Sequence, residues 1–175
     1  ALPPSILAEV VEIFMKGIAA LNITNGAAKG DIIHTSRGPV IGEIAARLSG
    51  GYMSGWTFPY SSGVEVTEAA LLVALGEAPC QLASRSQFVS AERAFISIPG
   101  RIASISGFEE ARSRNSIMDA FIRIRPGDRV SFPRNNVEKC GNFISRADSR
   151  NEAIDTAMKA EGSIVIRLES GYALT

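Results

Sequence analysis

The sequence has few cysteines and only one histidine, and these shortages narrow the chemistry it can carry. Cys80 and Cys140 are the only cysteines, and no CxxC pair or His-rich segment accompanies them. This pattern predicts two reduced thiols rather than a disulfide or a metal pair, and it favours a cytoplasmic protein. His34, the single histidine, is expected to be a surface or packing residue rather than a catalytic base.

The sequence also lacks a surplus of charge and a long apolar run. Its 18 basic side chains balance 18 acidic ones. Nucleic acids and membrane surfaces normally require a basic surplus or patch, so we expect neither as a partner. No apolar run reaches the roughly 18 residues of a membrane-spanning helix, and no signal segment begins the chain. An initial Met is absent too, which predicts a piece of a longer protein.

What remains is an ordinary globular composition, 46% hydrophobic and 21% charged, in a chain that alternates between helical and strand patterns. Apolar spacing and capping signals predict helices at 6–21 (capped by Ser5), at 64–75, at 108–112 and from a Ser149/Glu152 capping box to about residue 161. Strands are predicted at 29–35, 39–48, 91–98, 102–105, 118–124, 140–145 and 163–168, with a loop at 50–63. The fold class is α+β with prominent antiparallel hairpins.

The first two strands are predicted to form a hairpin around a three-residue loop, 36–38, and this register places Asp31 opposite Glu43. Opposed side chains have Cβ atoms about 5 Å apart. Two carboxylates so close would repel each other unless a cation lay between them. Hard oxygen ligands that leave room for phosphate and water suit Mg²⁺. The spacing therefore suggests a cation site, although two acids on a solvated face, or a slipped register, would fit the same sequence.

The segment after Glu43 favours an anion next to that cation. Arg47 lies four residues later, about 13 Å along an extended strand, and its forked donors could hold the far side of a polyphosphate. Ser49, Gly50 and Gly51 follow in a loop whose backbone amides can approach an anion closely.

The aromatic residues that follow this loop leave two interpretations open, and the arginines further along the chain have one. The loop residues Tyr52 and Trp56 either contact substrate or pin the loop to the core, and the arginines 123, 125, 129 and 134 are expected on a solvated face.

This order of residues resembles the C-terminal lobe of ATP-grasp ligases. The resemblance rests on the runs 38–52, 57–59, 63–70 and 74–77, and on 23–31, whose last residue corresponds to the family's first metal acid. It continues through 91–168, where 99–101, 107–111 and 125–128 resemble the C-terminal subdomain of carbamoyl-phosphate-synthase-like and L-amino-acid-ligase-like members. The resemblance implies an ATP-grasp C-terminal lobe, an antiparallel sheet with helices, at 1–86, and a small α+β subdomain at 87–175.

The resemblance also implies an activity, the ATP-dependent joining of a carboxylate to an amine or a thiol through an acyl-phosphate. Asp31 and Glu43 would hold Mg²⁺ (or Mn²⁺), and Arg47 would be the catalytic and phosphate-binding residue. Ser49, Gly50 and Gly51 would line the acceptor side of the site. The implied partners are ATP, a small carboxylate or amine substrate, the front lobe or a separate subunit that supplies it, and a second copy of the chain if the protein is a homodimer.

Two departures from the family pattern bear on these expectations. Many members carry Asn two residues after the second acid, where this chain has Ala45, which cannot bind a metal. The phosphate-binding loop and lysine of a front lobe are also absent, since Lys16 and Lys29 follow no Gly-rich loop. We therefore expect the isolated chain to be inactive. A non-catalytic binding or assembly module that kept the fold is the alternative.

Overall fold

The computed structural model describes residues 2–79 and 81–170, which form two compact units. Unit 1 contains the described residues of 1–50 and 65–83, and unit 2 contains those of 51–64 and 84–170. Cys80 lies outside the described residues. Within them, no helix is long and apolar enough to cross a membrane. The predicted division into 1–86 and 87–175 concerns the domains of the family, and it stays a prediction.

Unit 1 consists of two helices and a hairpin, α1 (Pro4–Ala20), β1 (Lys29–Thr35), β2 (Gly38–Ala45) and α3 (Val66–Ala74). Helix α1 starts two residues earlier than predicted. Its N-cap is Pro3, which makes no side-chain hydrogen bond, so the predicted Ser5 cap is wrong. Proline suits the first turn because the backbone N–H that it lacks would have had no partner within the helix.

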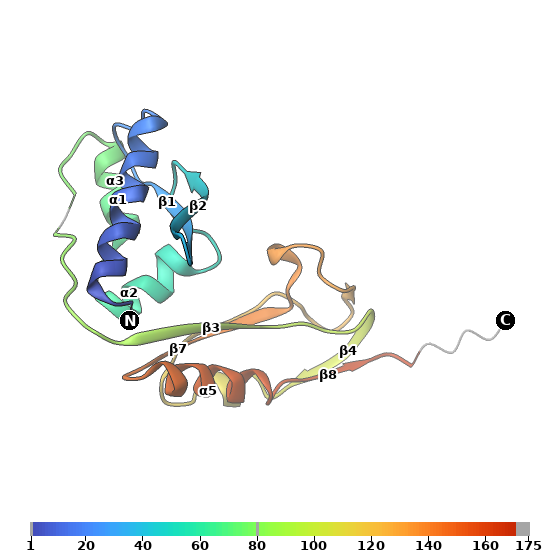
Figure 1. Ribbon diagram of the computed structural model, residues 1–175. Coiled ribbons are helices and arrows are strands. Elements are labelled where there is room, and N and C mark those ends of the chain that lie inside the picture. The colour runs from blue at the N-terminus through green and yellow to red at the C-terminus, as the bar shows by residue number, and fades with distance from the viewer. Residues whose placement is uncertain (1, 80, 171–175) are drawn as a thin grey trace. The chain divides into compact units, whose positions relative to one another are not determined.

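Helix α1 packs closely on one face of the hairpin (Figure 1). Two glycines permit this approach. A Cβ atom on Gly17 would lie 2.4 Å from Ile44 Cδ1, and one on Gly30 would lie 2.5 Å from Phe14 Cε2. Residues on the other face remain exposed, among them the opposed pair Ile33 and Val40, which are 64% and 50% exposed.

The hairpin register differs from the predicted one in an instructive way. Its loop has two residues instead of three, because Thr35 pairs with Gly38. That shorter loop alone would have moved Asp31 out of line with Glu43. A register shift between Asp31 and Ile32 adds the missing residue, so Asp31 does pair with Glu43 as predicted. The shift also means that Ile41 pairs with Ile32, so Ile41 and Glu43 lie on different faces of the hairpin although they are two residues apart.

Unit 2 contains two three-stranded antiparallel sheets (Figure 1). The first has the order β3 (Val89–Phe95), β7 (Gly141–Ala147), β5 (Ile117–Ile122), and the second β6 (Arg129–Val130), β4 (Gly100–Ser106), β8 (Val165–Leu168). Its helices are η1 (Met53–Thr57), α2 (Phe58–Ser62), α4 (Phe108–Arg112), η2 (Asn136–Glu138) and α5 (Arg150–Glu161). The loop predicted at 50–63 is wrong for its greater part, because η1 and α2 are helical.

Helix α5 covers one face of the first sheet and closes the core of unit 2. Ser149 caps α5 by accepting a hydrogen bond from the Glu152 backbone N–H at 3.2 Å, as predicted. The buried side chains beneath the helix include Phe95, Phe108 and Phe143. Gly141 lies among them, since a Cβ atom there would be 2.3 Å from both the Phe121 carbonyl oxygen and the Phe95 ring. Core packing therefore occupies most of the α5 face of this sheet.

Candidate functional site

The uncovered face of the hairpin in unit 1 carries four charged side chains. Lys29 lies on the same strand as Asp31, and its Nζ donates to Asp31 Oδ2 at 2.5 Å and to Glu43 Oε1 at 3.3 Å. The hydrogen bond to Asp31 in particular, with a smaller contribution from Glu43, raises the pKa of Lys29 above its ordinary value. The ammonium group thus supplies the positive charge that two opposed carboxylates require.

Arg47 completes this charged cluster, at a shorter distance than expected. Strand β2 ends at Ala45, and a turn follows in which the Arg47 N–H donates to the Ala45 carbonyl at 2.9 Å. The chain therefore does not extend for 13 Å beyond Glu43. Arg47 Nη2 lies 3.8 Å from Glu43 Oε1, and Nη1 donates to the Leu48 carbonyl at 3.0 Å. With 58% of its side chain exposed, Arg47 retains donors that face solvent.

The donor set can be tested for its fit to a metal ion. No group of three or more His, Cys, Asp or Glu side chains in the described part of the chain could hold a metal on its own. Two carboxylates do fit Mg²⁺ of the kind that keeps several waters and is shared with substrate phosphates. Such an ion would have to replace at least one hydrogen bond of Lys29. The residues therefore fit a nucleotide-bound Mg²⁺ and do not fit a cation held by protein atoms alone.

The predicted acceptor residues fall at the boundary between the two units. Ser49 and Gly50 end the first segment of unit 1, and Gly51 begins unit 2 with φ of +62°. A Cβ atom on Gly50 or Gly51 would meet no other atom within 4 Å, so the surroundings of these backbones are open. Their role as the acceptor side of the site stays a prediction.

Sequence reasoning missed Lys29 as a member of the site. It treated this lysine as irrelevant because no Gly-rich loop precedes it. The alternation of side chains along a β-strand would have been enough to find Lys29. It is two residues from Asp31 on one strand, so the two side chains share a face. Lys29 also pairs with Ala45 across the hairpin.

Unit 2 holds an aromatic cluster that immediately follows the Gly-rich loop. The ring of Tyr52 stacks on Phe121 with centroids 4.9 Å apart and meets Trp56 edge-on at 5.1 Å. Arg123 Nη2 donates to the Tyr52 hydroxyl at 2.5 Å, and Arg123 Nη1 donates to the Val137 carbonyl at 3.2 Å. The backbone of Tyr52 has a φ of +66°, a conformation that residues other than glycine rarely adopt. These contacts support the interpretation that the aromatic residues pin the loop to the core of unit 2.

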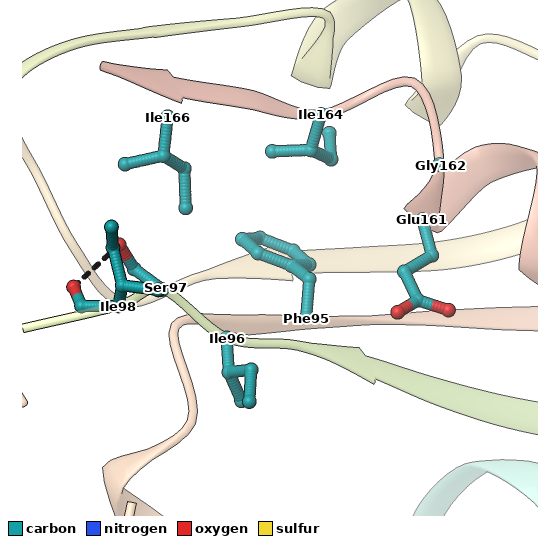
Figure 2. A pocket seen from close by; sticks show the side chains of 8 residues that line it. All are labelled: Phe95, Ile96, Ser97, Ile98, Glu161, Gly162, Ile164 and Ile166. Atoms are coloured by element: carbon teal, nitrogen blue, oxygen red, sulfur yellow. Dashed lines mark hydrogen bonds between the residues drawn. The ribbon is translucent and has the colours of Figure 1, made fainter. Parts of the chain in front are cut away.

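A cavity of about 340 Å³ lies at the α5 side of unit 2, and Figure 2 shows its lining. Its only charged lining group, the Glu161 carboxylate, lies 3.4 Å from Arg93 Nε and is therefore paired. The Ser97 hydroxyl donates to the Ile98 carbonyl at 3.0 Å, so it is satisfied as well. The remaining lining is mainly isoleucine and Phe95. With its polar groups already paired, this cavity is a weaker candidate than the charged face of the hairpin.

Comparison with known proteins identifies the fold. A model of the L-amino acid ligase C-terminal domain 2 matches residues 94–169. Among solved structures, the L-amino acid ligase from Bacillus licheniformis superposes with a TM-score of 0.80 at 18% identity, over 97% of this chain and 43% of that one. The chain has the fold of the C-terminal portion of an ATP-grasp ligase. No match was found among curated protein sequences.

Two further structures show how widely this ATP-grasp fold is shared. Phosphoribosylglycinamide synthetase from Anaerococcus prevotii gives a TM-score of 0.84 at 17% identity, over 96% of this chain and 43% of its own. The biotin carboxylase domain dimer of Hydrogenobacter thermophilus 2-oxoglutarate carboxylase, solved with MgADP and bicarbonate, gives 0.70 at 14% identity, over 95% of this chain and 37% of its own. The chain therefore spans less than half the length of the ATP-grasp proteins that it resembles.

Proposed function

We propose that this chain is the C-terminal part of an ATP-dependent carboxylate–amine ligase that acts through an acyl-phosphate. The observation that carries the proposal is the opposed pair Asp31 and Glu43, with Lys29 and Arg47 beside it on the face of the hairpin that α1 leaves free. Catalysis of phosphoryl transfer depends mainly on positioning and charge neutralisation, and this cluster has the groups for both tasks.

Each residue has a distinct role in this proposal. Asp31 and Glu43 would hold Mg²⁺ together with phosphate oxygens of ATP, and the ion would neutralise negative charge on those oxygens. Arg47 would donate to phosphate oxygens through its exposed guanidinium nitrogens. Lys29, released in part from the carboxylates, would be a second cation for the phosphates. Ser49, Gly50 and Gly51 would line the acceptor side.

An apolar surface adjoins the acids and suits the rest of a nucleotide. Ile33 lies two residues beyond Asp31 on β1, and its partner Val40 lies opposite it. Both side chains are at least half exposed, so they offer apolar surface to a ligand. A flat, largely apolar ring such as a nucleotide base could cover them while its phosphates reach the charged cluster.

The relatives support the finer points of the proposal. MgADP in the biotin carboxylase domain of 2-oxoglutarate carboxylase supports a Mg–nucleotide complex here, and its dimer supports a homodimer for the complete protein. The domain match favours an amino acid as one substrate. We propose a cytoplasmic location, where ATP is abundant. Completion of the nucleotide site would need further residues from the same protein or from a second subunit.

The test is calorimetric titration of Mg²⁺–ATP into the complete protein that carries this chain, with the release of ADP measured when amino acids are added. We expect binding and turnover in the wild type and a loss of at least about 10²-fold in turnover for Glu43→Ala. Glu12→Ala, on the exposed side of α1, is the matched control. Equal binding and hydrolysis by the wild type and Glu43→Ala would overturn the metal-site assignment.

A second function is favoured by one specific contact. Because Lys29 already neutralises Asp31 and Glu43, and Ala45 removes a third ligand, the chain could instead be a non-catalytic module that kept the fold without its metal. In that case the complete protein would not hydrolyse ATP with any amino acid, and Mg²⁺ would change neither its stability nor its ligand affinity.

A further inference from the structure

The first sheet of unit 2 has an uncovered edge at β5. In the part of the chain that the structure describes, β5 pairs with β7 on one side and with no strand on the other. A cavity of about 610 Å³ lies along this second side. Four consecutive residues, 120–123, line it together with the Tyr52 and Trp56 rings and Phe108 of α4. The edge is therefore open to another strand.

The hydrogen bonds to β7 show which backbone groups of β5 face this cavity. The Arg123 N–H donates to the Cys140 carbonyl at 2.9 Å, on the side of β7. Backbone groups of successive residues in a strand point to opposite sides, so those of Phe121 also face β7, whereas those of Ala120 and Ile122 face away from it. No backbone hydrogen bond to a loop or turn of the described residues uses Ala120 or Ile122. Their two N–H and two carbonyl groups are left for a further strand.

The residues of this edge are complementary to those of a second copy that runs antiparallel to it. When the two-fold axis passes between the Phe121 residues of two copies, Ala120 of each copy lies opposite Ile122 of the other. Their outward backbone groups can then form four hydrogen bonds, and the two Phe121 residues become a non-hydrogen-bonded pair. In the same register Asp119 lies opposite Arg123 of the second copy, because both are two residues from Phe121.

The opposite charges of Asp119 and Arg123 favour this register. Asp119 accepts a hydrogen bond from the Tyr60 hydroxyl, and Arg123 donates to the Tyr52 hydroxyl and the Val137 carbonyl, so neutral groups hold both side chains in place. Neither side chain forms an ion pair with another described residue. Opposite charges across two strands attract each other. A shift of the register by two residues in either direction would instead place the Phe121 ring opposite a charged side chain.

We propose that the outer edge of β5 joins two copies of this chain, so that their three-stranded sheets form one continuous antiparallel sheet across a two-fold axis. The inference goes beyond the proposed function, which supports a homodimer without assigning a surface to it. Association through this edge needs neither ATP nor a metal ion. Because the same edge of each copy is used, the contact closes at two copies and does not continue into a fibre.

The experiment measures the mass of the full chain by analytical ultracentrifugation over a range of concentrations, without nucleotide or Mg²⁺. We expect the mass to rise from that of one chain to that of two as the concentration increases. Ala120→Pro removes one outward N–H and leaves the hydrogen bonds to β7 in place, because edge strands tolerate proline where the N–H faces away from the sheet. This variant should associate at least about tenfold more weakly than the wild type.

Two charge reversals test the register. Asp119→Arg sets arginine against arginine across the two-fold axis, and Arg123→Asp sets aspartate against aspartate, so each variant alone should associate at least about tenfold more weakly than the wild type. An equimolar mixture of the two variants should recover association, because every opposed pair then joins an arginine to an aspartate. Asp155→Arg, at an exposed position of α5, makes the same change of charge away from the edge and should associate like the wild type. Circular dichroism checks that each variant is folded.

Three results would overturn the proposal. The first is a wild type that stays a single chain at every concentration, which would leave the edge to a strand from a different partner. The second is association that Ala120→Pro and both charge reversals leave unchanged, which would place the interface elsewhere. The third is a mixture that associates no better than either reversed variant alone, which would mean that Asp119 and Arg123 do not face each other. Because ATP is omitted throughout, failure here leaves the Mg–nucleotide test of the hairpin unaffected, and failure there leaves this one unaffected.

Discussion

The Lys29 ammonium lies 2.5 Å from Asp31 Oδ2 and 3.3 Å from Glu43 Oε1, so one side chain bridges both acids of the hairpin. A lysine here means that the acids do not repel each other when no metal is bound. It also means that Mg²⁺ and Lys29 compete for the same oxygens. Metal should therefore occupy the site only when a bound ligand, such as a nucleotide, adds enough binding energy for Mg²⁺ to displace Lys29 from the carboxylate oxygens.

Replacement of Lys29 by Met should make the hairpin dependent on divalent cations. Without the ammonium, Asp31 and Glu43 repel each other directly. We expect Mg²⁺ at millimolar concentration to raise the melting temperature of Lys29→Met, measured by differential scanning fluorimetry, and to leave the wild type nearly unchanged in the absence of nucleotide. Lys16→Met, which removes an exposed pair with Glu12 on α1, is the control. An identical Mg²⁺ response in the wild type and Lys29→Met would contradict the competition.

The same lysine predicts a dependence of stability on alkaline pH. Hydrogen bonding to Asp31 raises the folded-state pKa of Lys29 above its unfolded value, which is about 10.4. Its contribution to stability is therefore fully present below the unfolded pKa and is lost as the pH rises through the higher folded pKa. The melting temperature of the wild type should exceed that of Lys29→Met at pH 8, and the difference should vanish above that folded pKa. A difference that persists there would show that the lysine acts through packing.

The sequence predicted which two acids of the hairpin lie opposite each other, but it did not predict the loop length or the register shift that bring them together. Spacing identified Asp31 and Glu43 as opposed acids, and the structure pairs them. It did so with a loop one residue too long, and a register shift next to Asp31 compensated for the error. A β-bulge has no clear signature in a single sequence. The residues before it and the residues after it each show the alternation of an ordinary strand, so the pattern does not reveal the extra residue between them.

The cavity of unit 2 that is lined by Glu92, Arg123 and Asn142 could not be predicted from the sequence. Glu92, Arg123 and Asn142 come from or lie next to three strands whose spatial order, β3-β7-β5, is not their order along the chain. Local patterns identify strands, but the choice of neighbours depends on long-range packing, here around Phe143 and α5. Arg123 is exposed, as predicted for a residue of a solvated face, but the sequence did not show that it also donates to the Tyr52 hydroxyl and lines the cavity.

Gly141 should be one of the least replaceable residues of unit 2. A Cβ atom there would lie 2.3 Å from a backbone oxygen that cannot move without breaking the β5–β7 pairing. We expect Gly141→Ala to lower the free energy of unfolding, measured by urea denaturation, by about 1–3 kcal/mol. Gly55→Ala is the matched control, since a Cβ atom at Gly55 meets nothing within 4 Å. Equal stabilities of the two variants would contradict the close packing at Gly141.

Cys140 should be an unreactive thiol in the folded protein. It is free and 2% exposed, and burial raises the pKa of its thiol, which keeps the reactive thiolate scarce. In a Cys80→Ser background, a disulfide-exchange reagent at pH 8 should modify no thiol under native conditions and one in denaturant. Rapid native labelling would show that the core around Cys140 opens readily.

Arg47 provides the sharpest test of phosphate recognition, because its present contacts contribute little to stability. Its pair with Glu43 is 3.8 Å long and solvent-exposed, and such pairs are weak. Arg47→Lys should therefore leave the melting temperature unchanged. In the complete protein it should lower kcat by about 10–10²-fold, since an ammonium group cannot make the two parallel hydrogen bonds of a guanidinium. Arg37→Lys, in the loop of the same hairpin, controls for the loss of an arginine. Full turnover by Arg47→Lys would mean that Arg47 does not hold the phosphates.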